Sequence, residues 1–215
     1  MKFSPDTTLR TKQLPRQERA LKRIRSILAA AAELIAEQGY EHLSMVGIAA
    51  RAGITHTSMY RYFGSMEDLL AALLEEYLSD FDQRLSEQVA AANSPQEMIE
   101  AILLGVDYGF QMYRSIPAAR GLWSTSRYLQ RLREIEQEDS RRMTRMLQVH
   151  LQRLRPDIDP ADSRLKLELM NNLVVPAYEF ALLQPVEQQE AAMQAFCDLA
   201  RQHLTALFNA AQPAR

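Results

Sequence analysis

Apolar side chains recur at three- and four-residue spacing along most of the chain, and this period constrains its fold more than any other feature. In the segment that ends at Gln38, for example, Ile24, Ile27, Leu28 and Ala31 lie on one face of a helix. Only seven glycines occur in 215 residues, and no stretch shows the two-residue alternation of a β-strand. The sequence therefore predicts an all-α protein.

Glycine and proline residues mark the ends of the expected helices. Gly39, Gly53 and Gly64 each follow a segment with helical spacing, and glycine readily adopts the left-handed conformation that ends a helix. Pro176 lies inside a later segment and is expected to kink that helix, because its ring removes an amide donor. The expected helices cover residues 16 or 19–38, 45–52, 55–62, 65–92, 95–114, 117–123, 125–155, 161–184 and 187–209.

Basic residues are concentrated near the N-terminus. Residues 1–62 carry ten Lys or Arg and five Asp or Glu, whereas the remaining residues carry 15 and 22. This imbalance indicates that the N-terminal part meets a polyanion, and the alternative is a chance excess on a solvated surface. Residues 1–18, which contain two prolines and several basic residues, are expected to form a flexible basic arm.

Features that indicate secretion, membrane insertion or catalysis are missing from the sequence. Cys197 is the only cysteine, which excludes an internal disulfide and fits a reducing cytosol. Residues 1–20 lack the apolar run of a signal peptide, and no apolar stretch approaches the roughly 20 residues of a bilayer-spanning helix. The four histidines lack metal-ligand spacing, and no phosphate loop or serine elbow occurs. We expect a cytoplasmic, non-enzymatic protein without cofactor, metal or membrane partner.

Residues 43–63 predict two short helices joined by a tight turn at residues 52–54. Small alanines allow the two helices to approach closely, and the apolar residues are spaced to face inward. This pattern is typical of a helix-turn-helix, which presents its second helix to the major groove of DNA. The alternative is a helical hairpin whose polar face is only solvated. The residues expected to face inward are Ile48, Ala49, Ala52, Ile54, Met59 and Phe63.

Four stretches of this region resemble the TetR family of transcriptional regulators. They are Ile27–Tyr40, Ile48–Thr55, Met59–Phe63 and Ser65–Leu70, and they follow one another in that family's order and spacing. The resemblance covers about residues 23–74. It implies a helix-turn-helix DNA-binding domain, here residues 19–64, and a larger helical domain, here 65–215, that binds a ligand and dimerises.

Three positions depart from the pattern of that family. Gly47 stands where an acid is usual, Thr57 replaces a small residue near the start of the recognition helix, and Met66 stands where a phosphate-contacting lysine is common. We expect Arg23, Arg25 or the N-terminal arm to replace that lysine. The side chains expected to reach phosphates or base edges are Arg23, Arg25, Ser44, Thr55, His56, Thr57, Ser58, Tyr60, Arg61 and Tyr62.

Aromatic, flexible and polar residues of the larger domain are candidates for a ligand cavity, because such cavities are mostly apolar with a few polar groups. The alternative for each of them is ordinary core. Asn171 and Asn172 stand out, since a buried amide needs a hydrogen-bonding partner that a ligand can supply. The candidates are Tyr108, Phe110, Met112, Tyr113, Trp123, Tyr128, Met146, Asn171, Asn172 and Tyr178.

The last two expected helices each carry an apolar face, and the resemblance assigns these helices to a homodimer interface. The alternative is again intramolecular core. A symmetric dimer is physically sensible, because it places two recognition helices on half-sites about 34–36 Å apart. The candidate interface residues are Leu169, Leu173, Met193, Phe196, Ala200, Leu204 and Leu207.

These features together predict a ligand-responsive repressor. It is expected to bind a palindromic operator in double-stranded DNA as a dimer and to be released by a small, mainly hydrophobic or aromatic effector. The alternative is a helical protein-interaction or adaptor module that has lost specific DNA binding, which Gly47 and Met66 keep open. The sequence leaves open the effector, the operator, the regulated genes, and activation instead of repression.

Overall fold

The computed structural model describes residues 16–126 and 128–209, and every regular element within these ranges is a helix. The expected all-α architecture is therefore confirmed. Most of the expected basic arm lies outside the described residues. The elements are α1 (Arg16–Gln38), the short 3₁₀ helix η1 (Tyr40–His42), α2 (Met45–Arg51), α3 (His56–Met59), α4 (Met66–Ala91), α5 (Pro95–Ser115), α6 (Pro117–Ser126), α7 (Gln130–Leu154), α8 (Pro160–Leu182) and α9 (Val186–Asn209).

The recognition helix is shorter than the sequence predicts. α3 ends at Met59 instead of residue 62, because the chain closes into a turn there. The backbone amides of Tyr62 and Phe63 both donate to the carbonyl oxygen of Met59, at 2.9 and 3.1 Å. The residues that follow α3 are thus presented by a turn and not by a continuing helix.

The boundary between α6 and α7 also differs from the expected one. α7 begins at Gln130 and not at residue 125, and the amide of Leu129 donates to the carbonyl oxygen of Thr125 at 3.1 Å. Neither glycine nor proline occurs between residues 122 and 130, so nothing in the sequence marks this break. α8 continues as a single helix from Pro160 to Leu182, with Pro176 inside it.

Side-chain caps begin most of the helices where the sequence predicts a start. Each cap oxygen accepts a hydrogen bond from a backbone amide that has no partner inside its helix, which stabilises the first turn by about 1 kcal/mol. The Oγ of Ser44 accepts from the amide of Gly47 at 3.0 Å, as the sequence suggests. The other capping residues are Thr55, Ser65, Ser94 and Asp159.

Gly53 makes the turn between α2 and α3. Its φ of +66° lies in the left-handed region, and the amide of Ile54 donates to the carbonyl oxygen of Ala49 at 2.9 Å. The turn therefore needs a residue without a side-chain penalty at positive φ.

We expect Gly53→Ala to lower the free energy of unfolding by about 1–2 kcal/mol, because alanine is strained at this φ. A Cβ at Gly53 would have no atom within 4 Å, so the loss comes from backbone strain alone. Thermal unfolding measures the effect. Gly53→Asn is the matched control and should lose less, since asparagine tolerates positive φ. Equal losses for the two variants would contradict the assignment.

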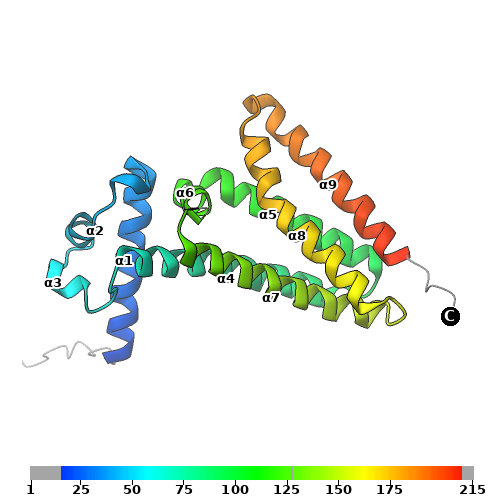
Figure 1. The fold of residues 1–215 in the computed structure, drawn as a ribbon, viewed down its shortest axis with the longest axis horizontal. Helices are drawn as coiled ribbons and strands as arrows, with labels where there is room; N and C mark the ends of the chain where they lie inside the picture. The colour runs from blue at the N-terminus through cyan, green and yellow to red at the C-terminus, as the bar shows by residue number, and fades with distance from the viewer. Residues whose placement is uncertain (1–15, 127, 210–215) are drawn as a thin grey trace, which may run out of the picture.

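The helices form two parts (Figure 1), and one cluster of buried residues extends from the first part into the second. The first part, the reader, consists of α1, α2 and α3, and the second, the body, consists of α4–α9. α4 leads from the reader into the body, where it runs beside α7. One cluster of buried residues continues from Ile48 and Met59 of the reader to Leu74 and Phe110 of the body, and a second fills the far end. The orientation of the reader is therefore coupled to the packing of the body.

α6 forms the second contact between the two parts. It packs on α1, and a Cβ added to Gly121 would lie 3.0 Å from Cγ2 of Ile35. The two helices approach this closely because Gly121 has no side chain. A shift of α6 is thus transmitted to α1 by direct contact.

Candidate DNA-binding surface and ligand cavity

The reader holds α3 by one fully buried residue and leaves most of the surrounding surface exposed. Met59 is fully buried against the core, whereas His56, Thr57, Tyr60 and Arg61 are exposed. The rings of His56 and Tyr60 meet edge to face with centroids 4.9 Å apart. This pair gives the exposed surface a fixed, partly aromatic shape that can lie against a duplex.

Two of the hydroxyls expected to contact DNA cap helices in the structure. Ser44 and Thr55 are exposed but cap α2 and α3, and Thr55 Oγ1 also donates to the Oγ of Ser58 at 2.9 Å. Ser58 and Tyr62 are half-buried. Any contact that these four residues make with DNA is consequently limited in reach, compared with the exposed residues of the same segment.

The exposed basic groups of the reader differ in their partners. Arg23 and Arg25 are exposed on α1. Arg51 instead ties α2 to α1, with ion pairs to Glu33 at 3.1 Å and to Glu37 at 2.6 Å. Its hydrogen bond holds the pKa of the Glu37 carboxyl below its usual range. The guanidinium of Arg51 therefore positions the helix-turn-helix on α1.

The body contains a cavity of about 290 Å³ between α4, α5, α7 and α8, which we call the inner cavity. Of the candidates from the sequence, Met112, Tyr113, Trp123, Asn171, Asn172 and Tyr178 line it. Apolar side chains such as Phe81, Ile102 and Met170 complete the wall. The inner cavity thus has the mixed lining of a small-molecule site.

Four of the candidates lie elsewhere, which corrects the expectation for them. Tyr128 is 78% exposed between α6 and α7. The hydroxyl of Tyr108 donates to Asp80 at 3.1 Å on the outside of α4 and α5. Met146 faces a different hollow, and Phe110 is fully buried behind Tyr178. Helical spacing alone did not distinguish these faces from the lining of the cavity.

The two asparagines already have protein partners. The Nδ2 of Asn171 donates to the backbone oxygen and the Oγ of Ser140, at 3.2 and 3.0 Å. The Nδ2 of Asn172 donates to the same Oγ and to the carbonyl oxygen of Glu168. These amides tie α8 to α7, so a ligand is not needed to satisfy them.

Aromatic rings form one end of the inner cavity. Tyr113 lies between Trp123 and Tyr178, with ring centroids 5.9 and 5.7 Å away. The hydroxyl of Tyr178 donates to the carbonyl oxygen of Val106 at 2.8 Å, and burial raises the pKa of this phenol. Because Trp123 belongs to α6, a molecule at this end touches the helix that contacts α1 of the reader.

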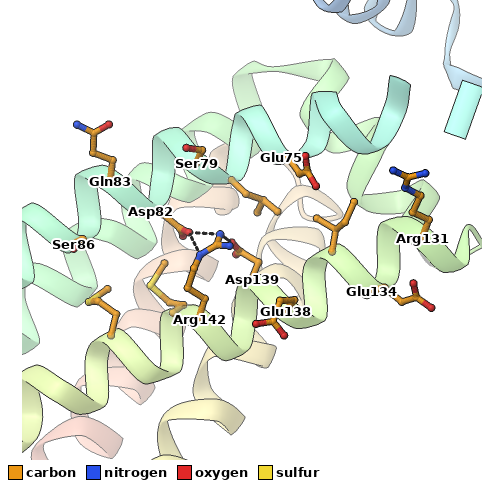
Figure 2. A pocket seen from close by; sticks show the side chains of 14 residues that line it. Glu75, Ser79, Asp82, Gln83, Ser86, Arg131, Glu134, Glu138, Asp139 and Arg142 are labelled. Atoms are coloured by element: carbon orange, nitrogen blue, oxygen red, sulfur yellow. Dashed lines mark hydrogen bonds and ion pairs between the residues drawn. The ribbon is translucent and has the colours of Figure 1, made fainter. Parts of the chain in front are cut away.

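A second hollow of about 840 Å³, the outer groove, runs between α4 and α7 (Figure 2). Arg142 of α7 reaches between Asp82 of α4 and Asp139 of α7, and its Nε lies 3.0 Å from Asp82 Oδ2. Burial, and then the nearby charge of Asp82, raise the pKa of Asp139 to about 7. We did not expect these three residues from the sequence, because charged positions on helices normally face solvent.

The raised pKa of Asp139 predicts a specific pH dependence of stability. The folded protein holds this proton more tightly than the unfolded chain, whose carboxyl has the ordinary value of 3.8. The contribution of this proton to the free energy of unfolding is therefore fully present below about pH 4 and is lost as the pH rises through about 7. Between about pH 5 and pH 8, we expect the free energy of unfolding of Asp139→Asn to rise by about 1–2 kcal/mol relative to that of the parent, measured by urea unfolding.

The exposed Glu134, on the same helix, gives the matched control. Glu134→Gln makes the same chemical change at an exposed position. The difference in free energy of unfolding between this variant and the parent should not change with pH. A pH-independent difference for Asp139→Asn would show that Asp139 titrates normally.

Comparison with known proteins identifies the family. Residues 27–73 match the profile described as "Bacterial regulatory proteins, tetR family". Residues 94–208, more than half of the chain, match the profile "Tetracyclin repressor-like, C-terminal domain". The chain belongs to the TetR family of transcriptional regulators. Its helix-turn-helix and its all-α body are thereby established as those of a TetR-family protein.

Several known transcriptional regulators match part of the chain. A fatty acid metabolism regulator of Bacillus subtilis is 32% identical over 77 residues, 36% of this chain and 40% of that protein. The regulator HbdR of Aromatoleum is 32% identical over 73 residues, 34% of this chain and 32% of that protein. The regulator BetI of Agrobacterium fabrum is 26% identical over 143 residues, 66% of this chain and 65% of that protein. The matches thus span one third to two thirds of these relatives.

Solved structures share the TetR fold over nearly the whole chain. A TetR-family regulator from Streptomyces coelicolor superposes with a TM-score of 0.69 at 24% identity, covering 87% of this chain and 98% of that one. The multidrug binding protein EbrR complexed with imidazole superposes with a TM-score of 0.65 at 19% identity, covering 89% and 97%. At this identity the likeness concerns the fold. No described helix is both long and apolar enough to cross a bilayer.

The residues expected at a TetR-type dimer interface divide into two groups. Met193, Ala200, Leu204 and Leu207 of α9 are buried within the core of one chain, which corrects the expectation that they contact a partner. Phe196 is half-buried. Leu169 and Leu173 of α8, in contrast, are 57% and 49% exposed. They belong to an apolar stripe, which we call the α8 stripe, formed by Leu165, Leu169, Leu173 and Phe180 of α8 and by Leu183 directly after it.

Proposed function

We propose that this TetR-family regulator is a repressor that binds a palindromic operator as a homodimer and releases it when a small, mainly hydrophobic effector enters the inner cavity. The observation that carries the proposal is the position of α6. Trp123 of α6 lines the cavity, and Gly121 of the same helix lies against Ile35 of α1. A ligand that moves α6 therefore acts directly on the reader.

The proposed DNA contacts come from the exposed surface around α3. Thr57 and His56 lie at the start of α3, where side chains reach base edges, and Tyr60 and Arg61 follow it, where they reach phosphates. Arg23 on α1 supplements them. Arg25, Ser44, Thr55, Ser58 and Tyr62 remain proposed contacts from the same surface.

The α8 stripe supports a homodimer. Exposed leucines and a phenylalanine along two thirds of one helix form the kind of apolar patch that marks an interaction site. The match to the family's C-terminal profile ends at residue 208, so it includes α8 and all but the last residue of α9. We propose that α8 and α9 of two copies pack as a four-helix interface, with the α8 stripe at its centre. The protein then acts in the cytoplasm, where DNA is available.

Gel-shift titration of the DNA that flanks the gene tests this function. A repressor should bind one site in that DNA far better than random DNA, and its affinity should fall as salt is raised. Addition of an effector should release the site. Absence of any preferred site would favour a helical adaptor that has lost specific DNA binding.

The variants Tyr60→Ala and Thr57→Gly separate the roles of two residues. We expect Tyr60→Ala to weaken binding to all duplexes by roughly tenfold, because it removes a phosphate contact. Thr57→Gly should instead change which base is preferred near the centre of each half-site, measured on single-base variants of the site. Equal losses of both variants on every sequence would contradict this assignment.

A further inference from the structure

The inner cavity and the outer groove meet at one acidic side chain. Leu78, Asp139 and Met143 line both of them, so these residues form the wall where the two hollows join. The side chain of Asp139 is 13% exposed. A molecule in the inner cavity therefore contacts a carboxyl group that is nearly removed from solvent.

Negative charge at this wall exceeds positive charge. Asp82 and Asp139 share the guanidinium of Arg142, whose side chain is 54% exposed and reaches them from the groove (Figure 2). The Oδ1 of Asp82 is buried and has no hydrogen-bond partner among the described residues. Two poorly solvated carboxylates that share one cation are destabilised by their mutual repulsion. Burial, and after it the nearby charge of Asp82, raise the pKa of Asp139.

The rest of the inner cavity has matching chemistry. Glu136 and Glu179 also line it, and each of them already has an interaction partner. Phe81, Tyr113 and Trp123 line it as well, and aromatic faces attract organic cations. The aromatic lining thus favours the same class of ligand as the Asp139 carboxylate.

We propose that the effector of the inner cavity is a hydrophobic amine, whose ammonium group lies against Asp139 and whose apolar part lies among the aromatic side chains. The proposal rests on the proposed function, because it names the ligand class of the same cavity. An added cation compensates the second carboxylate of the Asp82–Asp139 pair, whereas a carboxylate ligand adds a further negative charge. A volume of about 290 Å³ suits a small molecule with one ring and a short chain.

A charge series on one carbon skeleton tests the proposal. The probes are 3-phenylpropylamine, 3-phenylpropanol and 3-phenylpropanoate, used at about pH 8 so that Asp139 is ionised. Trp123 is the only tryptophan in the sequence and lines the inner cavity, so its fluorescence reports occupancy directly. Isothermal titration calorimetry gives the Kd values independently.

We expect the amine to bind at least about tenfold more tightly than the alcohol, and the carboxylate to bind most weakly. Asp139→Asn should raise the Kd of the amine by about tenfold and leave the Kd of the alcohol within about twofold of its value for the parent. Glu134→Gln makes the same change on the same helix, at an exposed position that lines only the outer groove, and should alter none of the three.

Three results would overturn the proposal: equal affinity for the three probes, tightest binding of the carboxylate, or no binding of the amine. An unchanged preference for the amine in Asp139→Asn would also overturn the placement of the ammonium group. The operator titration reads out the proposed function separately. If the protein binds an operator and a neutral or anionic molecule releases it, the proposed function is supported and the proposal of an amine effector is overturned. If the protein binds the amine but no preferred DNA site, the ligand class is supported and the proposed function is overturned.

Discussion

Replacement of Leu169 and Leu173 by glutamate is expected to make the protein monomeric and to weaken its binding to an inverted-repeat duplex by about a hundredfold or more. Both side chains lie in the α8 stripe and are about half exposed in one chain. Glutamates at these positions would bury four unpaired carboxylates in the proposed dimer interface, which opposes association. A monomer holds one half-site and loses the gain from two linked contacts.

Sedimentation equilibrium measures the oligomeric state, and fluorescence anisotropy measures the DNA affinity. Because both leucines are exposed in one chain, the variant should keep the helical circular dichroism of the parent. Leu104→Glu is the matched control, since Leu104 is 60% exposed on α5 and lies outside the α8 stripe. A folded double variant that remains dimeric would exclude the α8 stripe as the interface.

Gly109→Ala is expected to lower the free energy of unfolding by about 2 kcal/mol, although alanine favours helix by about 1 kcal/mol. A Cβ at Gly109 would lie 2.3 Å from the hydroxyl oxygen of Tyr178 and 3.2 Å from the ring of Phe81. Tyr178 is buried and donates to Val106, so it can move only by giving up that hydrogen bond. The melting temperature should fall by roughly 4–8 °C.

Gly105→Ala, one turn earlier on α5, is the matched control for this effect. Its Cβ would lie 2.7 Å from Cδ1 of Leu85, the end of a flexible side chain that can rotate away. The gain in helix propensity is the same for both variants, so Gly105→Ala should remain within about 1 kcal/mol of the parent. If Gly109→Ala proved as stable as Gly105→Ala, the close contact between α5 and Tyr178 would be wrong.

Local signals explain which parts of the fold could be predicted from the sequence. The starts of α2, α3 and α4 lie within one residue of the expected ones, and Ser44, Thr55 and Ser65 cap them, because a cap depends on residues only three positions apart. Gly53 similarly makes the expected turn. The end of α3 and the start of α7 were misplaced, because turns held by carbonyl acceptors leave no mark in composition.

Periodicity shows that a helix has an apolar face but does not show what covers that face. The apolar face of α9 was assigned to a partner chain, and the structure packs Met193 and Leu204 into the core of the same chain. On α8 the exposed leucines and the buried Leu167 lie on different sides of one helix, and both sides are apolar. Only the packing of the neighbouring helices distinguishes them.

Part of the candidate ligand site could not be predicted for a related reason. Trp123 and Tyr178 were expected in the cavity because they are aromatic, and they do line it. Asp82 and Asp139 belong to helices that are distant in the sequence, and each resembles an ordinary solvated charge until α4 and α7 pack together. The charge at the cavity wall, and hence the ligand class proposed for it, therefore follows only from the tertiary structure.

Selection of binding sites from a pool of random DNA duplexes tests the central claim most directly. The account predicts enrichment of an inverted repeat whose half-sites lie about one helical turn apart, bound by two chains, with an affinity that falls steeply as salt is raised. Recovery of duplexes with no common sequence, or of a single half-site bound by one chain, would contradict it.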